Sequence, residues 1–541
     1  MDKPQSGDPL EPGHRPASRL SQSGIWKWQR DFFHQQGIGA WRTATVPHYA
    51  TNNPALAHAY AELVFGFLRD CLAARQGEAE RADAESPQPF YIIELGAGSG
   101  RFGYLFLKRL LDTLRRFSSQ GLSIKYVLTD FTGSNVEFWR AHPALRPFIE
   151  QGQLDFAVFD VERDHELRLL QGGETLSPGT LHHPLIVLAN YVFDSIGQDA
   201  FIVEDGHLSE CLISLGSEEP DTSVPSSPFE GLEYQFVSRR TSSEYYPEPE
   251  FNEILSEYAR TLDRTTVLFP CSALRCLQRL AKLSSGQLLL LTGDKGYVEE
   301  EDLRGLDAPR LALHGSFSLM VNYHAITAYM SRRAGRVLKM QRPHASLCVL
   351  ACVLGSGTSG CTNLERSYDL LIAHTGPDDF FVLRRALHNH LETLTPEELL
   401  ALIRASHDDP RVLRDCVPAL LRRLAEISDR TRHEILRTER RVWDNYYHIG
   451  EEEDLAFELG VLLFALGYAL EAASLFQRSL QLYGDNPSTL WNVGLCYYRL
   501  DMQEQASRFF GEARRRDPDF YPTGALQLTA SPPKARPDKT S

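Results

Sequence analysis

A glycine-rich stretch after an apolar run is the first place in this 541-residue chain where the residue types could hold a ligand. Residues 90–93 are apolar and favour a strand. Four glycines follow them, at Gly96, Gly98, Gly100 and Gly103. Glycine lets the backbone turn sharply and approach a ligand closely. Residues 104–114 then carry leucine and phenylalanine at helical spacing, so the stretch is typical of the start of a nucleotide-binding βαβ unit.

Two acids are candidates for binding a nucleoside. Asp130 ends a second predicted strand at residues 124–128, where a carboxylate can accept hydrogen bonds from both ribose hydroxyls. The same residue could instead cap the helix expected through residues 135–140. Asp160 ends a third predicted strand, where an acid can accept from the exocyclic amine of a base; a loop or capping role explains it equally well.

A second group of polar residues follows the buried strand predicted at residues 184–189. We expect Asp194 to act as a general base or to orient a substrate, and Asn190 to anchor a cofactor or a substrate by a hydrogen bond. Both could also belong to a hydrogen-bonded cluster that only shapes the turn. His324 is a second candidate base, and a satisfied, partly buried histidine is the alternative.

The string Glu94-x-Gly96-x-Gly98-x-Gly100 resembles motif I of class I S-adenosylmethionine-dependent methyltransferases. Residues 98–103 also fit the G-x-G-x-x-G dinucleotide pattern, but a dehydrogenase normally has an apolar residue in place of the acid, so S-adenosyl-L-methionine (SAM) is favoured over NAD. The resemblance implies cofactor binding by Glu94, Gly96, Ala97, Gly98, Gly100, Asp130, Asp160 and Asn190.

The resemblance narrows to the MidA family. Residues 189–196, A-N-Y-V-F-D-S-I, are similar to its A-N-E-x-F-D-x-L segment, and residues 315–324 and 47–60 resemble its late and N-terminal segments. The family implies an α/β fold with a Rossmann-like seven-stranded methyltransferase sheet, and Tyr49 and Asn53 closing over the site. Tyr191 stands where the family has Glu; if that carboxylate holds a guanidinium, this chain takes another substrate or none.

The composition bounds the remaining possibilities. A net charge of −15 argues against general nucleic-acid binding, and no apolar run is long enough for a membrane helix. Residues 1–23 are polar and lack a targeting core, so we expect them to be disordered and the protein to be cytoplasmic. Cys348, Cys352 and Cys361 do not have zinc spacing, and we expect no metal site.

The expected methyltransferase domain spans residues 24–360, and helices follow it. Within it we expect a helical cap at 24–74, a mobile linker at 75–88 and the core at 89–360. A helical linker domain at 361–452, two repeats at 453–520 and a disordered tail at 521–541 complete the chain.

The two repeats are defined by residues that recur 34 positions later. The pairs are Leu459 and Val493, Gly460 and Gly494, Ala472 and Ala506, and Phe476 and Phe510. The pattern is similar to tetratricopeptide repeats, which bind proteins on a concave surface. The sequence thus predicts a SAM-dependent methyltransferase acting on a protein side chain, arginine being possible, with repeats that recruit the substrate or a partner. The alternative is an inactive methyltransferase fold that serves as a scaffold through its repeats.

Overall fold

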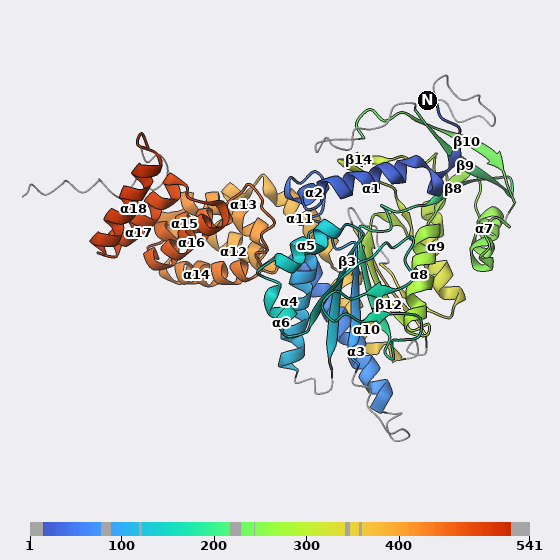
Figure 1. The fold of residues 1–541 in the computed structure, drawn as a ribbon, viewed down its shortest axis with the longest axis horizontal. Coiled ribbons are helices and arrows are strands. Elements are labelled where there is room, and N and C mark those ends of the chain that lie inside the picture. Colours follow the sequence, from blue (N-terminus) through green and yellow to red (C-terminus); the bar gives the residue numbers. More distant parts are fainter. Residues whose placement is uncertain are drawn as a thin grey trace, which may run out of the picture. The chain divides into compact units, whose positions relative to one another are not determined.

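The computed structural model describes residues 14–76, 88–117, 122–216, 229–242, 244–340, 347–355 and 360–520. The chain divides into two compact units, Met1–Val382 and Leu383–Ser541. The first unit mixes helices and strands, and the described part of the second is helical (Figure 1). The mixed α/β class predicted for the first unit is therefore confirmed.

A seven-stranded sheet forms the centre of the first unit. Its order is β17 (Arg336–Leu338), β18 (Cys348–Leu354), β12 (Leu288–Asp294), β7 (Leu185–Asn190), β2 (Phe90–Leu95), β3 (Ile124–Asp130) and β4 (Leu154–Val158). The strands from β12 to β4 are parallel, and β18 is antiparallel to both of its neighbours. The chain runs outward from β2 through β3 to β4 and then returns to the other side of β2 with β7. The order therefore reverses between β2 and β7.

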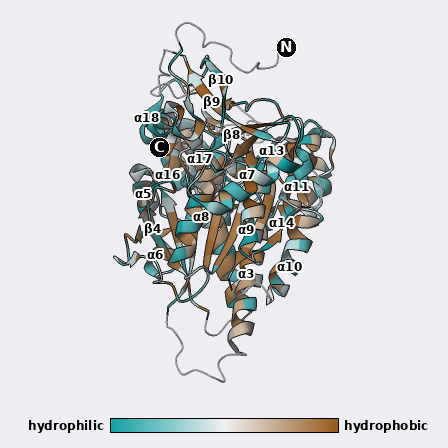
Figure 2. Cartoon of the chain, turned by 90° about the vertical axis from the view of Figure 1, so that its right-hand side faces the viewer, coloured by the Kyte–Doolittle hydropathy of each residue, from teal (hydrophilic) through white to brown (hydrophobic). Residues whose placement is uncertain are grey.

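The central strands are buried along their whole length because both faces of the sheet are covered. Every residue of β2, β12 and β18 is buried. Figure 2 shows brown, hydrophobic strands in the middle of the α/β unit. The helices of this unit are α1 (Gly24–Gln36), α2 (Gly39–Arg42), α3 (Pro54–Gln76), α4 (Arg101–Arg116), α5 (Gly133–Ala141), α6 (Arg146–Glu150), α7 (Pro249–Thr261), α8 (Cys271–Leu283), α9 (Tyr323–Arg332) and α10 (Thr362–Tyr368).

A second sheet lies beside the N-terminal helix. It contains β1 (Ser18–Arg19), β9 (His207–Leu215), β8 (Asp199–Glu204) and β11 (Thr265–Phe269), with β10 (Tyr234–Arg240) also paired to β9. The sequence predicts a β-hairpin here, with strands at residues 200–203 and 208–215 around the turn Glu204-Asp205-Gly206, and the β8–β9 hairpin confirms it. Trp26 and Trp28 of α1 pack in an apolar cluster with residues of this sheet and with Phe317. Smaller strand pairs are β5 (Leu167–Arg168) with β6 (Thr175–Leu176), β13 (Gly296–Tyr297) with β16 (Val321–Asn322), and β14 (Ala312–His314) with β15 (Ser316–Ser318).

The predicted disorder of residues 1–23 is wrong for their second half. β1 pairs with β9, and a short 3-10 turn, η1 (Leu20–Gln22), leads into α1. Residues 1–13, most of the predicted linker (77–87) and the predicted tail (521–541) lie outside the described residues.

The first unit also extends beyond the predicted boundary at residue 360, to Val382. Asp70 of α3 explains the attachment, since its carboxylate accepts hydrogen bonds from the backbone nitrogens of Asn363 (3.1 Å) and Leu364 (3.0 Å) at the start of α10. Tyr368 donates to the Val349 carbonyl of β18 at 2.6 Å. Residues 361–382 thus belong to the α/β unit rather than to a separate helical linker.

The second unit is a series of helices. They are the end of α11 (Pro377–His388), α12 (Pro396–Ala405), α13 (Pro410–Arg422), α14 (Asp429–Asp444), α15 (Leu455–Ala465), α16 (Ala469–Tyr483), α17 (Pro487–Arg499) and α18 (Gln503–Arg516). A β-carbon at Gly460 would lie 2.7 Å from Phe476, and one at Gly494 would lie 2.5 Å from Phe510. The same glycine-to-phenylalanine contact therefore packs both helix pairs, as the 34-residue recurrence requires.

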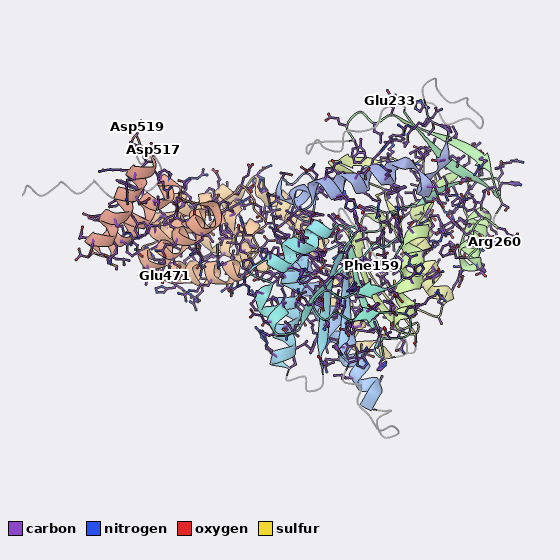
Figure 3. All side chains as sticks on the ribbon, viewed as in Figure 1. Phe159, Glu233, Arg260, Glu471, Asp517 and Asp519 are labelled. Atoms are coloured by element: carbon purple, nitrogen blue, oxygen red, sulfur yellow. The ribbon has the colours of Figure 1, made fainter. Side chains whose placement is uncertain are left out.

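In Figure 3 the second unit can be found by the labels at Glu471 in α16 and at Asp517 and Asp519, which follow α18.

Among the described residues no helix has the length and apolar character needed to cross a bilayer. The cytoplasmic location stays a prediction.

Candidate functional site

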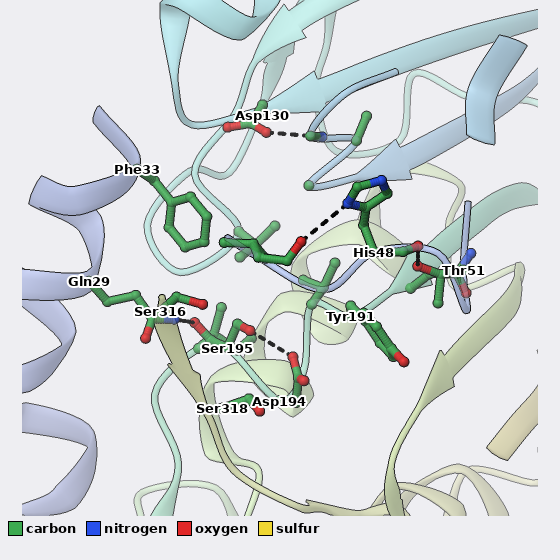
Figure 4. Close-up of a pocket in the computed structure, with 18 of the residues that line it drawn as sticks. Gln29, Phe33, His48, Thr51, Asp130, Tyr191, Asp194, Ser195, Ser316 and Ser318 are labelled. Carbon is green, nitrogen blue, oxygen red and sulfur yellow. Dashed lines mark hydrogen bonds between the residues drawn. The ribbon is translucent and has the colours of Figure 1, made fainter. Parts of the chain in front are cut away.

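A pocket of about 310 Å³ lies at the carboxyl ends of the parallel strands, where the strand order reverses. Open α/β sheets bind ligands in this crevice. Its lining comes from the residues that follow β2, β3, β4 and β7, from α1 and the loop after α2, and from the β14–β15 hairpin. In Figure 4, Asp130 lies at one end and Asp194, Ser195, Ser316 and Ser318 lie at the other. We call these the nucleotide end and the acceptor end.

The glycine turn forms part of the nucleotide end. Gly96, Gly98 and Gly100 have φ angles of 57°, 54° and 76°, a backbone region that side chains disfavour. Gly96, Ala97 and Gly98 line the pocket, whereas Gly100 is not among the lining residues and precedes α4 as its N-cap. The turn is fixed from outside, since the Trp139 indole nitrogen donates to the Gly98 carbonyl at 3.0 Å.

Asp130 is buried at the tip of β3 and lines the pocket beside this turn. Its carboxylate accepts from the backbone nitrogens of Thr132 (2.8 Å) and Gly98 (3.2 Å) and from the Asn135 amide (3.3 Å). Burial raises its pKa, and these donors oppose the shift. A carboxylate has about four acceptor positions, so roughly one remains for a ligand. The alternative role as the N-cap of α5 is wrong, since Thr132 is the N-cap residue of that helix. Asp130 instead orders the loop before α5 and keeps room for a ligand.

Glu94 lies deeper, in β2, and is 6% exposed. The Tyr126 hydroxyl donates to its carboxylate at 2.5 Å. Burial raises the pKa of Glu94 to about 8, so at neutral pH most of this residue is protonated. Glu94 is therefore a hydrogen-bonding group at the pocket floor until a cation approaches it.

Asp160 lines the pocket after Phe159, which is buried within the α/β unit (Figure 3). Arg30 of α1 binds the Asp160 carboxylate through both guanidinium nitrogens, at 2.5 and 3.3 Å. The same guanidinium lies 4.7 Å from the centre of the Phe131 ring. Because Arg30 binds it, the Asp160 carboxylate is less available to a nucleotide base. The sequence did not predict this role of Arg30.

A further aromatic side chain covers the glycine turn. A β-carbon at Gly98 would lie 2.8 Å from Trp41 Cζ2, so the indole rests directly on this glycine. Trp41 also stacks on Phe33 at 5.7 Å between ring centres. Both residues lie in the helical cap expected at residues 24–74, where aromatic side chains could cap a core or line a cleft. No local pattern predicts their contact with the glycine turn, because it depends on how α1 and α2 pack.

Asn190 and Asp194 are brought to the same pocket by the end of β7. The Tyr60 hydroxyl donates to the Asn190 side chain at 2.7 Å, and the Ser195 hydroxyl donates to Asp194 at 2.7 Å. Burial raises the pKa of Asp194 to about 6, and Lys295 opposes the shift. Asp194 therefore can change between ionised and protonated forms near neutral pH, as a general base must. Between them Tyr191 has a φ of 54°, so the backbone of this turn is strained at a residue other than glycine.

Asp294, at the end of β12, also binds this turn. The sequence predicted no role for this residue. It is fully buried, one oxygen accepts from the Phe193 backbone nitrogen at 3.3 Å, and the other has no partner in the described structure. Burial and the nearby Asp194 charge raise its pKa well above the ordinary value. Asp294 follows the apolar run at residues 287–292, and an acid at the end of a buried strand could have indicated this role.

His324 is not brought to the pocket. It lies at the start of α9, where its Nδ1 is 2.9 Å from the Tyr258 hydroxyl, and burial lowers its pKa. Its predicted role as a base has no geometric support, and the alternative of a hydrogen-bonded, partly buried histidine describes it.

Two residues expected to close over the site also lie outside its lining. Tyr49 packs against Phe381 at 5.7 Å, and Asn53 accepts from the Leu56 backbone at the start of α3. Their neighbours His48, Thr51 and Asn52 line the pocket instead. In the described ranges no group of three His, Cys, Asp or Glu residues could hold a metal.

Comparisons with known proteins are sparse. No family model matches the chain. Intraflagellar transport protein 70A of Danio rerio is 30% identical over 79 residues, which are 15% of this chain and 12% of that protein. The chain therefore spans about an eighth of the length of this curated relative.

Three solved structures are similar at low identity. An uncharacterised superfamily protein of Burkholderia thailandensis has a TM-score of 0.38 at 11% identity, covering 64% of this chain and 90% of its own. A member of the same superfamily from that organism, a suggested methyl transferase bound to S-adenosyl-homocysteine, has a TM-score of 0.35 at 13% identity over 60% and 74%. The CurJ carbon methyltransferase has a TM-score of 0.23 at 11% identity over 62% and 69%. At these values the function of this chain is argued from its own residues.

Proposed function

We propose that the protein is a SAM-dependent methyltransferase that acts on a protein side chain. The observation that carries this proposal is the two-ended pocket at the reversal of strand order, with a glycine turn and Asp130 at one end and Asp194 at the other. The seven-stranded sheet with one antiparallel strand is the fold that the sequence resemblance implies. The pocket volume also falls in the range of about 300–1,000 Å³ found for small-molecule sites.

The residues of the nucleotide end fit the proposed cofactor. The three positive φ angles leave a bare backbone turn, and Asp130 keeps an acceptor position beside it for a ribose hydroxyl. Glu94 would ionise when a positive charge approaches, because a nearby cation favours the carboxylate. When bound, the cofactor supplies an electrophilic methyl group on a sulfonium.

The residues of the acceptor end would orient the nucleophile and take its proton. Asp194 is held by the Ser195 hydroxyl, and the Leu319 backbone nitrogen donates to the Asp194 carbonyl at 2.9 Å. A fixed carboxylate with a pKa of about 6 can accept a proton near neutral pH and contributes roughly 100- to 10,000-fold as a general base. Asn190 would hold a polar group of either ligand.

The second unit would recruit the protein substrate or a partner. Its helix pairs repeat the same glycine-to-phenylalanine packing, and stacks of such pairs expose a continuous surface for peptides. The tetratricopeptide assignment and the protein substrate both belong to the proposal.

One observation favours an inactive scaffold as the second candidate. Trp41 rests on Gly98, and Arg30 binds Asp160, so protein side chains cover part of the nucleotide end. A cofactor would have to share this space or displace the indole.

Transfer of a tritiated methyl group from SAM to proteins of a cell lysate, resolved by gel, tests the proposal. We expect the full-length protein to label a discrete band, and Gly98→Arg to label none because the new side chain fills the turn. No label with the unmodified protein in lysates of several cell types, together with no binding of SAM, would favour the scaffold.

A further inference from the structure

Two cations at the acceptor end have no role in the proposed transfer. Lys295 directly follows β12, Arg310 precedes β14, and both line the pocket with exposed side chains. Neither side chain has a hydrogen bond or a salt bridge to another residue of the described ranges. Positive charge at the mouth of a pocket attracts anionic ligands.

The acids that line the same pocket do not neutralise these cations. Arg30 binds Asp160 and lies 3.6 Å from Glu162. Glu94 is mostly protonated at neutral pH, and Asp130 belongs to the nucleotide end, where three donors bind its carboxylate. The charge of Lys295 lowers the pKa of Asp194, although no salt bridge joins the two side chains in the described structure. At the acceptor end two cations, Lys295 and Arg310, therefore accompany one carboxylate, Asp194.

Backbone hydrogen bonds tie Lys295 and Asp194 to the segment at residues 319–321. The Val321 backbone nitrogen donates to the Lys295 carbonyl, and the Leu319 backbone nitrogen donates to the Asp194 carbonyl, both at 2.9 Å. Residues 312–318 form the hairpin that leads into this segment, and Ser316 adds a hydroxyl to the lining. Lys295, Arg310 and Asp194 therefore line the same pocket, with Lys295 and Asp194 held by one segment of the chain.

We propose that the acceptor is an acidic peptide segment, in which a carboxylate beside the methylated side chain binds Lys295 and Arg310. The inference rests on the proposed function for the transfer, but binding of the segment does not require transfer.

The test is a binding measurement on the full-length protein with S-adenosylhomocysteine present. Two labelled peptides of equal length are compared, one rich in Glu and one rich in Lys, with fluorescence anisotropy as the readout. We expect the Glu-rich peptide to bind about tenfold more tightly, and the double variant Lys295→Glu/Arg310→Glu to lose about tenfold of that affinity. The matched control is Arg116→Glu/Lys282→Glu, which makes the same charge change with residues outside the pocket lining.

Two results would overturn the inference. One is equal or tighter binding of the Lys-rich peptide, and the other is an equal loss of affinity in the control variant, which would mean that only net charge matters. Binding of S-adenosylhomocysteine, measured separately by calorimetry, tells the two proposals apart. If the protein binds S-adenosylhomocysteine but does not prefer the Glu-rich peptide, only the acidic-peptide inference is rejected. If it prefers the Glu-rich peptide, loses that preference in Lys295→Glu/Arg310→Glu and does not bind S-adenosylhomocysteine, only the methyltransferase proposal is rejected.

Discussion

The two ends of the pocket differ in how far the chain satisfies its own polar groups. At the nucleotide end Asp130 accepts from three donors, Asp160 is bound by Arg30, and Trp41 covers Gly98. At the acceptor end Lys295 and Arg310 have no salt bridge in the described structure. The first end is thus already organised, which lowers the entropic cost of binding one small molecule. At the acceptor end a bound anionic ligand would neutralise the charges of Lys295 and Arg310.

The largest effect should come from Asp194 at the acceptor end. We expect Asp194→Ala to lower methyl transfer by roughly 100- to 10,000-fold because it removes the general base. Affinity for S-adenosylhomocysteine should stay within about twofold, since Asp194 lies away from the nucleotide end. Radiolabel transfer and calorimetry measure the two quantities. An equal loss of transfer rate and of affinity for S-adenosylhomocysteine would mean that Asp194 binds the cofactor. The two ends of the pocket would then not have separate roles.

The next effect should come from Asp130. We expect Asp130→Ala to weaken binding of S-adenosylhomocysteine by roughly 10- to 100-fold, because a hydrogen bond to a charged group contributes about 1.5–3 kcal/mol. Asp160→Ala is the matched control and should weaken it less, since Arg30 already occupies that carboxylate. Calorimetry compares the variants, and thermal unfolding shows whether each still folds. The opposite ranking would assign the nucleoside to Asp160.

A smaller effect should appear in the dependence of the transfer rate on pH, because Asp194 at the acceptor end must be ionised. Burial raises the pKa of Asp194 to about 6, and only the ionised form accepts a proton. With SAM saturating and the acceptor at low concentration, transfer should therefore be level above pH 7 and fall about tenfold per pH unit well below pH 6. Rates measured between pH 5 and pH 8 test this. A profile that rises toward acid would exclude a carboxylate base.

The smallest effect concerns Trp41. If a nucleoside displaces the indole from Gly98, Trp41→Ala should raise affinity for S-adenosylhomocysteine about threefold. Phe33→Ala, which removes the stacking partner and leaves the indole, is the control. A loss of affinity in Trp41→Ala would instead make the indole part of the binding surface.

The sequence predicted the elements of the site better than its contacts. The strand and glycine turn at residues 90–103, the acids after neighbouring strands and the β8–β9 hairpin follow from local patterns, because strand periodicity and glycine positions are local properties. Arg30, Trp41, Lys295 and Arg310 reach the pocket from segments distant in the chain. Side-chain contacts of that kind depend on packing and leave no local pattern.

Two predictions show the same limit. His324 lies in a segment that resembles the family, yet its ring bonds to Tyr258 of α7, a helix whose packing the sequence does not specify. The boundary at residue 360 came from flexible composition, whereas Asp70, nearly 300 positions earlier, holds α10 on the α/β unit. Which residues carry out the proposed chemistry stays a prediction.

Titration calorimetry of the full-length protein with SAM and, separately, with NAD tests the central claim most directly. The two-ended pocket predicts saturable one-to-one binding of SAM, competition by S-adenosylhomocysteine, and no saturable heat with NAD. Absence of saturable heat at millimolar SAM, or tighter binding of NAD, would contradict the account.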